Sequence, residues 1–524
     1  MRKSLVACAA AVSAIAVFPA LAGAHPDEAG ELYIPWADYV GQERAQELTR
    51  GAPAAGQVPT PPGTEDLQLI GNSDKDGTIN TDLAFNGNLV YAGNYAGFRI
   101  LDVRGNQPRV VVDHPCNGPQ NDVSFHKMGG RTFLFQSVDS GQDREDCSSV
   151  NAPLVGTARI GYEGVRVFDV SNPAEPKFLD MIQTACGSHT HTLIPGKHHG
   201  RHGGNDKAYI YVSSYPLGSG ITPPGTTNPP GGADFRECAV PHKKISIIEV
   251  SAPRGEFTYR LREQALADDT TPYQGGLGGA QFIACHDIQA FLKKDIALGS
   301  CAGESQIWDI SDRWRPGIQR ERNHTHIRRP ADATPREFEF MHSAFFSWDG
   351  KIVATMDEVG GGVEARCFGA PPASQDGYYY FYNVVKPGSP EPPLRSRYII
   401  PRPQGDQQEC VSHNGTAIPV RDRYLASIAY YKGGVSVVDF TDVDNPREVA
   451  YADVTDATGT SDEWSSYWYN GRIFSNSGLD RGEGETANRG LDVWRPSGGL
   501  ARTTWRAKRW AYSNPQTQEA WQAP

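Results

Sequence analysis

The sequence predicts an all-β fold, a seven-bladed β-propeller in a single domain, and three observations carry this prediction. A phrase recurs along the chain, with a small residue, an alternating strand, an acidic or amide residue and often a proline turn, as in GFRILDVRGNQP, GVRVFDVSNPAEP and GGVSVVDFTDVDNP. Apolar and polar residues alternate as half-buried strands require, and long helical periodicity is scarce. The chain of 524 residues also contains 56 Gly and 38 Pro, which suits the many turns of an all-β protein.

The acidic or amide residue of the phrase counts the repeated units. These seven anchors are Asp102, Asp169, Glu249, Asp309, Asn383, Asp439 and Asp492. Their intervals of 53 to 80 residues exceed the ~40–50 residues of a minimal propeller blade, so loops must be inserted. A unit of this kind cannot bury its own apolar face, so the copies must stack against one another. A β-sandwich is the alternative, but it would not need radial repetition.

Each unit is expected to contain three or four antiparallel strands in a fixed order. The first opens with a polar residue, as in DLAF from Asp82 and HSAFF from His342. The second has the form LVYAGNY, TFLFQSV, AYIYVSSY, IVATMDE, YLASIAYY or RIFSNSG. The anchor phrase follows as the third strand, and RVVVDH or EVAYADV is the fourth.

The last unit ends near Pro496 and lacks an outer strand. LQLIGNS, at residues 67–73, is expected to supply it. Such pairing would close the ring and remove an open sheet edge.

The anchor phrases RILDV, VRVFDVSNPAEP and VSVVDFTDVDNP resemble the LVIVD-repeat family of secreted and surface β-propellers. The resemblance covers roughly residues 65–496, and the fifth unit, with Asn383 in YYYFYNVVKPG, departs from it most. It implies the propeller fold and no set of catalytic residues.

The N-terminus predicts export. Arg2 and Lys3 precede an apolar run that ends in Ala22-Gly23-Ala24, as in a secretory signal with a small-residue cleavage site. We therefore expect a signal peptide at 1–24, an N-terminal extension at 25–63, the propeller at 64–496 and a tail at 497–524. The tail is expected to lie over the side of the propeller, with an interaction arm as the alternative.

The charge and hydropathy of the mature chain exclude two classes of partner. Removing Arg2 and Lys3 from the 50 basic residues leaves 48 against 61 acidic ones, a net charge of −13. This balance argues against nucleic acid as the main partner. No later stretch reaches the ~18 apolar residues of a membrane span.

Eight cysteines remain after the signal, an even number that indicates disulfides in an exported chain. Nearest-neighbour pairing gives Cys116–Cys147, Cys186–Cys238, Cys285–Cys301 and Cys367–Cys410. A thiolate metal site is the weaker alternative, because no CxxC occurs.

Aligned first strands predict a ring of polar residues at the mouth of the central channel, because the innermost strand of each blade lines that channel. The ring consists of Asp82, Asp122, His191 or His189, His286 with Asp287, His342, His413 with Asn414, and Ser466. Imidazoles converging from rigid strands, with carboxylates beside them, are suited to a transition metal, copper or zinc ahead of iron. The alternative is a water-filled channel lined by polar residues. Copper-dependent propellers of the selenium-binding and methanethiol oxidase group are similar in using histidines near the channel.

Other polar clusters give weaker predictions. Asn72, Asp74 and Asp76 have the oxygen spacing at which a calcium loop begins, although Leu83 stands where such a loop has its Glu. The histidines of KHHGRH (197–202), together with His324 and His326, are expected to lie in solvated polar loops, with metal binding as the alternative.

Three functions are therefore open. The chain is expected to be a secreted monomer that binds a small molecule or an extracellular protein or glycan, with a metal site at the channel. The second function is a copper-type oxidoreductase that uses the channel histidines. The third is a carboxylate-based sugar hydrolase or lyase that uses a pair from Asp82, Asp122 and Asp287.

Overall fold

A computed structural model describes residues 66–519 except 76, 153, 156, 157, 160, 198–206, 216–240, 274–282, 334–337, 339, 359–376, 403–410, 457, 458 and 479–488. The predicted signal and extension lie outside the described residues. So do Asp76, Cys238, Cys367, Cys410 and the histidines of the KHHGRH loop.

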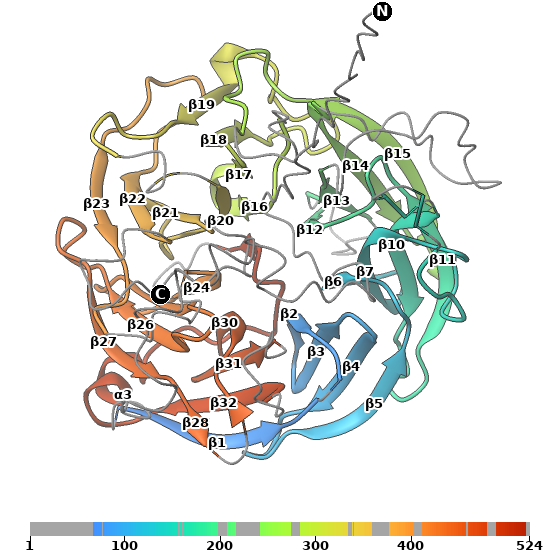
Figure 1. The fold of residues 1–524 in the computed structure, drawn as a ribbon, viewed down its shortest axis with the longest axis horizontal. Helices are drawn as coiled ribbons and strands as arrows, with labels where there is room; N and C mark the ends of the chain where they lie inside the picture. The colour runs from blue at the N-terminus through green and yellow to red at the C-terminus, as the bar shows by residue number, and fades with distance from the viewer. Residues whose placement is uncertain are drawn as a thin grey trace, which may run out of the picture.

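Antiparallel β-sheets arranged around a common centre dominate the described chain, which confirms the all-β prediction (Figure 1). Three sheets have four strands each: β6 (Gln120–Met128), β7 (Arg131–Gln142), β10 (Tyr162–Asp169) and β11 (Lys177–Gln183); β12 (Thr190–Pro195), β13 (Lys207–Ser213), β14 (Lys244–Ser251) and β15 (Thr258–Ala265); and β20 (Met341–Phe346), β21 (Ile352–Asp357), β22 (Tyr379–Asn383) and β23 (Leu394–Tyr398).

Two sheets have five strands, because a short strand of the C-terminal tail joins each of them. They are β2 (Asn80–Asn86), β3 (Leu89–Asn94), β4 (Gly97–Asp102) and β5 (Arg109–Pro115) with β33 (Tyr512–Ser513); and β16 (Ile288–Phe291), β17 (Ile296–Cys301), β18 (Glu304–Asp309) and β19 (His324–Ile327) with β34 (Thr517–Gln518).

The largest sheet has eight strands and consists of two four-stranded groups. One is β24 (Asn414–Ile418), β25 (Leu425–Ala429), β26 (Val435–Asp439) and β27 (Arg447–Ala452); the other is β30 (Glu463–Tyr469), β31 (Arg472–Ser477), β32 (Leu491–Pro496) and β1 (Leu67–Ser73). A parallel pairing of β24 with β30 joins them. The predicted antiparallel pairing of the LQLIGNS strand, β1, with the last strand, β32, is present.

Minor elements complete the described chain. They are the ribbons β8 (Leu154–Val155) with β9 (Ala158–Arg159) and β28 (Thr455–Asp456) with β29 (Gly459–Thr460), the helix α3 (Gly498–Thr504), and the 3₁₀ turns η3 (Pro253–Gly255), η5 (Leu292–Lys294) and η6 (Glu321–Asn323). None of the described helices is long and apolar enough to cross a membrane.

The acidic anchors of the repeat have a local role at the strand ends. Asp169, Asp309 and Asp439 each accept a hydrogen bond at 2.8–2.9 Å from the backbone N–H two residues further on. Asp102 does the same at 3.0 Å. An acceptor side chain in this position closes an Asx turn, which explains why the repeat places an acidic residue before its proline turn.

Apolar side chains fill the space between neighbouring sheets. Phe133 and Val165 of one sheet pack with Leu193 and Ile248 of the next in one buried cluster. Burial on this scale is the main stabilising contribution to such a fold, at roughly 25 cal/mol per Å² of apolar surface.

Two of the predicted disulfides are present, Cys116–Cys147 and Cys285–Cys301. Cys186 is also disulfide-bonded, and its predicted partner Cys238 lies outside the described residues.

The start of the C-terminal tail, α3, packs at the side of the molecule beside β32 and β1 as predicted, but the rest of the tail does not (Figure 1). After α3 it runs across the centre of the sheet arrangement, where it pairs with the last residues of β2 and β16 (Figure 1). It bonds in turn to strands of five sheet groups: β33 to β2, Asn514 to Phe125 of β6, Thr517 to Leu193 of β12, β34 to β16, and Gln518 to Phe346 of β20. Backbone groups at those strand ends, left without strand partners, explain this placement.

Asn514 is expected to hold this tail in place. Its side chain accepts from the Phe125 N–H at 3.0 Å and donates to the Phe125 carbonyl at 2.9 Å, both in buried positions. In Asn514→Ala these backbone groups lose their partners, so hydrogen exchange should accelerate at Phe125 and over residues 512–518. The exposed Asn445→Ala is the control. Unchanged exchange in Asn514→Ala would show that the tail is held by other contacts.

Candidate metal centre

Four histidines come together at the starts of the strands nearest the centre. His189 precedes β12, His286 precedes β16, His342 lies in β20 and His413 precedes β24. Their ring centroids follow one another at 4.3, 3.7 and 4.3 Å. We call this set the imidazole row. The tail crosses the opposite ends of the same strands, so it and the imidazole row lie at different ends of the channel.

His342 lies between His286 and His413 in the row, and its side chain is buried. Its side chain is 1% exposed, and neither ring nitrogen has a hydrogen-bond partner among the described residues. Burial, together with the neighbouring His286, His413 and His189, holds its pKa well below the usual 6.5. The ring is therefore neutral at physiological pH and has a lone pair that a metal ion can accept.

Carboxylates lie beside three of the imidazoles. Glu358 is 3.3 Å from His342 Nε2 and 3.4 Å from His413 Nε2, and Asp287 is 3.1 Å from His286 Nδ1. The ligand atoms of His342, Glu358 and His413 lie within 4.8 Å of one another, as do those of His286, Asp287 and His342. Ligand atoms around a tetrahedral ion with bonds of ~2.0–2.1 Å are about 3.3–3.4 Å apart, so small side-chain shifts are sufficient to enclose an ion.

The hydrogen bonds around Glu358 and His413 favour a cation between them. The carbonyl of Trp464 accepts from His413 Nδ1, which leaves the lone pair of a neutral ring on Nε2. This lone pair faces Glu358 Oε1, which already accepts from the Tyr431 hydroxyl. His413 Nε2 and Glu358 Oε1 are 3.4 Å apart, and two acceptors at this distance repel each other unless a proton or a metal ion lies between them.

His189 and His191, both predicted as ligands, are held by other partners. His189 Nδ1 bonds to Asp139 at 2.7 Å and its Nε2 to the Tyr215 hydroxyl at 3.0 Å, so both ring nitrogens have partners. The ring packs against His286. The ring nitrogens of His191 contact the hydroxyls of Ser124 and Ser137 at 2.7 and 2.8 Å. Burial lowers the pKa of His191 to about 3, and we leave both residues out of the ligand set.

Asp82, Asp122 and Asp287, the predicted channel carboxylates, form a buried acidic cluster in the channel. The neighbouring Asp82 adds to the effect of burial and raises the pKa of Asp122 well above its usual range, and Gln516 of the tail donates to Asp82. Burial raises the pKa of all three carboxyls, that of Asp287 to about 8. Part of this cluster is therefore protonated at neutral pH.

Sequence reasoning missed the groups at the ends of the second strands. Asp139, Tyr215, Glu358 and Tyr431 lie in or just after β7, β13, β21 and β25, and each bonds to the imidazole row or its carboxylates. Aligning the second strands as well as the first would have shown that Asp139 and Glu358 occupy the same position relative to their strands.

The predicted calcium residues have structural partners. The side chain of Asn72 donates to Asp492 at 2.7 Å and to the Arg489 carbonyl, while the carbonyl of Asp74 accepts from Arg99 at 2.9 Å. Asp76 lies outside the described residues, so calcium binding stays a prediction.

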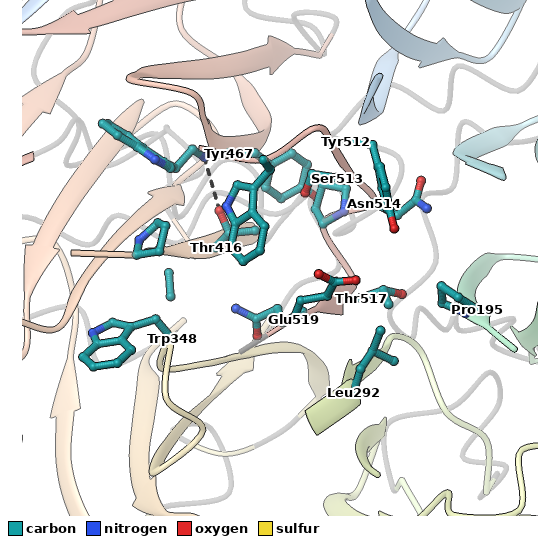
Figure 2. Close-up of a pocket in the computed structure, with 16 residues that line it drawn as sticks. Pro195, Leu292, Trp348, Thr416, Tyr467, Tyr512, Ser513, Asn514, Thr517 and Glu519 are labelled. Atoms are coloured by element: carbon teal, nitrogen blue, oxygen red, sulfur yellow. Dashed lines mark hydrogen bonds between the residues drawn. The ribbon is translucent and has the colours of Figure 1, made fainter. Parts of the chain in front are cut away.

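A hollow lies beside the C-terminal tail, and no histidine lines it (Figure 2). Tyr512, Asn514 and Thr517 of the tail face Trp348 and Tyr467 across it. Its lining includes five aromatic side chains and a single carboxylate, that of Glu519, so it does not offer a set of metal ligands.

Replacing Asp122 should change the pH dependence of stability. The native state holds a proton on the Asp82–Asp122 pair that unfolded aspartates release above a pH of ~3.9, so the contribution of this pair to stability falls as pH rises. Asp122→Asn removes one such group, and its stability relative to wild type should increase from pH 5 to pH 8 in urea unfolding with EDTA. The exposed Asp422→Asn should show no such trend. A constant difference for Asp122→Asn would mean that the pair does not hold this proton.

Comparison with known proteins leaves the family open. No family model matches the chain, and no curated protein matches it. Among solved structures it is similar to a hypothetical selenium-binding protein from Sulfolobus tokodaii, with 12% identity and a TM-score of 0.35. That match covers 61% of this chain and 65% of the other, less than two thirds of its length, and a likeness of this size carries no conclusion about fold or function.

Proposed function

We propose that this protein is an extracytoplasmic seven-bladed propeller of the LVIVD-repeat type that holds a transition-metal ion at the imidazole row and binds a small ligand or an extracellular partner there. His342 carries the proposal, because a buried neutral imidazole without a hydrogen-bond partner among the described residues is costly unless a ligand compensates for it.

A closed ring of seven blades is supported by contacts between the strands nearest the centre. The neighbours in contact are β2 with β6, β6 with β12, β12 with β16, β16 with β20, β20 with β24, β24 with β30 and β30 with β2. The pairing of β1 with β32 supplies the last blade with its outer strand. The disulfides and the N-terminal signal pattern support an exported protein.

His286, His342 and His413 would hold the ion, with Glu358 as a fourth ligand or as the acceptor that orients them. Three imidazoles and a carboxylate suit copper or zinc ahead of iron. Such an ion supplies either a Lewis acid or, if it is copper, an electron-transfer centre. The chain itself contributes the buried site and the hydrogen bonds to His413 and Glu358.

A copper-type oxidoreductase is the second candidate, and the aromatic shell favours it. Tyr431 and Trp464 pack on His413 with ring centroids at 4.8 Å, and Phe340 packs on His286 at 5.6 Å. An apolar shell of this kind controls solvent access and the reduction potential of a bound metal.

The carboxylate-based hydrolase is less well supported. Facing carboxyl groups in glycosidases are roughly 5–9.5 Å apart, to leave room for the sugar and water. Asp82 and Asp122 are instead close enough for Asp82 to raise the pKa of Asp122, and Asp82 already accepts a hydrogen bond from Gln516 of the tail.

Removing His342 should abolish tight metal binding at the channel. We expect His342→Ala to weaken the affinity for Cu²⁺ or Zn²⁺ by more than about 100-fold. This loss is larger than the roughly 10–100-fold loss that follows when a residue hydrogen-bonded to a metal ligand is replaced. Calorimetric titration and metal analysis of the protein purified from an oxidising compartment would measure this change. His342→Gln gives a second test if the smaller side chain leaves the protein unstable.

His191→Gln is the matched control, because it removes another buried channel histidine that we place outside the ligand set. Its affinity for metal should remain within a few-fold of wild type. Equal metal binding by wild type and His342→Ala would contradict the proposal.

The copper form should distinguish the two metal functions. Cu²⁺ bound at the row should give an electron paramagnetic resonance spectrum with coupling to several imidazole nitrogens, and His413→Gln should remove one of them. If the bound Cu²⁺ is reducible and reoxidised by air through several cycles, the oxidoreductase is favoured; if it is not, the ligand-binding function stands.

A further inference from the structure

A second histidine cluster lies at the outer edge of the sheet formed by β16–β19, away from the channel. His324 and His326 are two residues apart in β19, so their side chains project from the same face of the strand. Asp269 reaches them from the connection that follows β15 of the preceding sheet. We call these three residues the edge cluster.

The distances in the edge cluster match those between the ligands of a tetrahedral ion. The two Nε2 atoms are 3.1 Å apart, and His326 Nε2 is 3.1 Å from an oxygen of Asp269. His324 Nε2 lies 3.9 Å from the other Asp269 oxygen. Zinc with bonds of ~2.0–2.1 Å separates its ligand atoms by about 3.3–3.4 Å.

Both rings are oriented from behind by hydrogen bonds at Nδ1. His326 Nδ1 contacts Glu304 at 2.6 Å, and His324 Nδ1 contacts the Arg320 carbonyl at 3.1 Å. Glu304 is fully buried and is itself fixed by Thr271 and Gln306. A carboxylate or carbonyl behind each ring is the usual outer shell of histidine ligands, because it sets the tautomer and directs the Nε2 lone pair at the metal.

This arrangement needs a cation between the rings. When both Nδ1 atoms donate and both rings are neutral, the Nε2 lone pairs face each other at 3.1 Å, with the Asp269 carboxylate alongside. Arg328 lies 3.6 Å from Asp269 and 3.3 Å from Glu304, so its charge is placed on the two carboxylates. Only a shared proton or a metal ion relieves the repulsion between the two lone pairs.

We propose that Asp269, His324 and His326 form a zinc site with a fourth position open to solvent. Asp269 is 62% exposed and His324 only 2%, so the site is built into the sheet edge and reached from outside. Zinc held there links β19 to the connection after β15 and so ties the edges of two neighbouring sheets. Zinc binding at the edge cluster should therefore raise the melting temperature of the protein.

The test uses the full-length protein in the His342→Ala background, which removes the channel site, and titrates it with Zn²⁺. We expect one equivalent to bind, a binding loss of more than about 100-fold in His324→Gln and His326→Gln, and about 10-fold or more in Asp269→Asn. The melting temperature should rise with Zn²⁺ only in chains that keep the edge cluster. The control is His114→Gln, which removes a half-buried histidine of β5.

Imidazole NMR of the same protein separates zinc from a shared proton. Zn²⁺ should shift the signals of His324 and His326 at constant pH. Signals that stay unchanged at millimolar Zn²⁺, or equal Zn²⁺ binding by the cluster variants and their parent, would overturn the proposal. Melting temperatures in EDTA show whether each variant folds. Because the channel site is already removed, the outcome does not depend on the metal proposed for the imidazole row.

Discussion

Strands from separate sheets start side by side around one centre, and the side chains at those starts therefore share a small volume. His286, His342 and His413 are far apart in the sequence, yet their rings are in contact. Stacked sheets with apolar packing between them hold each strand start at a fixed level, so the imidazoles are brought together without any local sequence motif.

Burial has opposite consequences for the two kinds of titratable group in this channel. It keeps His342 neutral and available as a ligand, and it keeps protons on the aspartates below the row. A channel with a neutral imidazole end and a protonated acidic cluster carries little charge despite its many ionisable residues. The chain can thus enclose these groups without the full cost of burying ions.

The fold was predictable from sequence because anchor residues and strand alternation both set the register. The same register placed His286, His342 and His413 together. The register did not place His191 in the row. His191 lies two residues, or about 6–7 Å, further along its strand than His189, and there it hydrogen-bonds to Ser124 and Ser137. Glu358 and Tyr431 were missed because they follow second strands. The path of the tail was not predictable, because the tail is held largely by backbone groups at the ends of strands. Such groups are present in every sequence and give no sequence signal.

The pairing of β1 with β32 has a consequence for how the chain must mature. Leu67 meets Pro496 in that pairing, so nearly the whole polypeptide has to be present before the sheet is complete. The Cys116–Cys147 and Cys285–Cys301 bridges span only 31 and 16 residues and need no such wait. These two disulfides can therefore form within short segments of the chain, whereas the sheet that contains β1 and β32 is completed only when segments from opposite ends of the described chain meet.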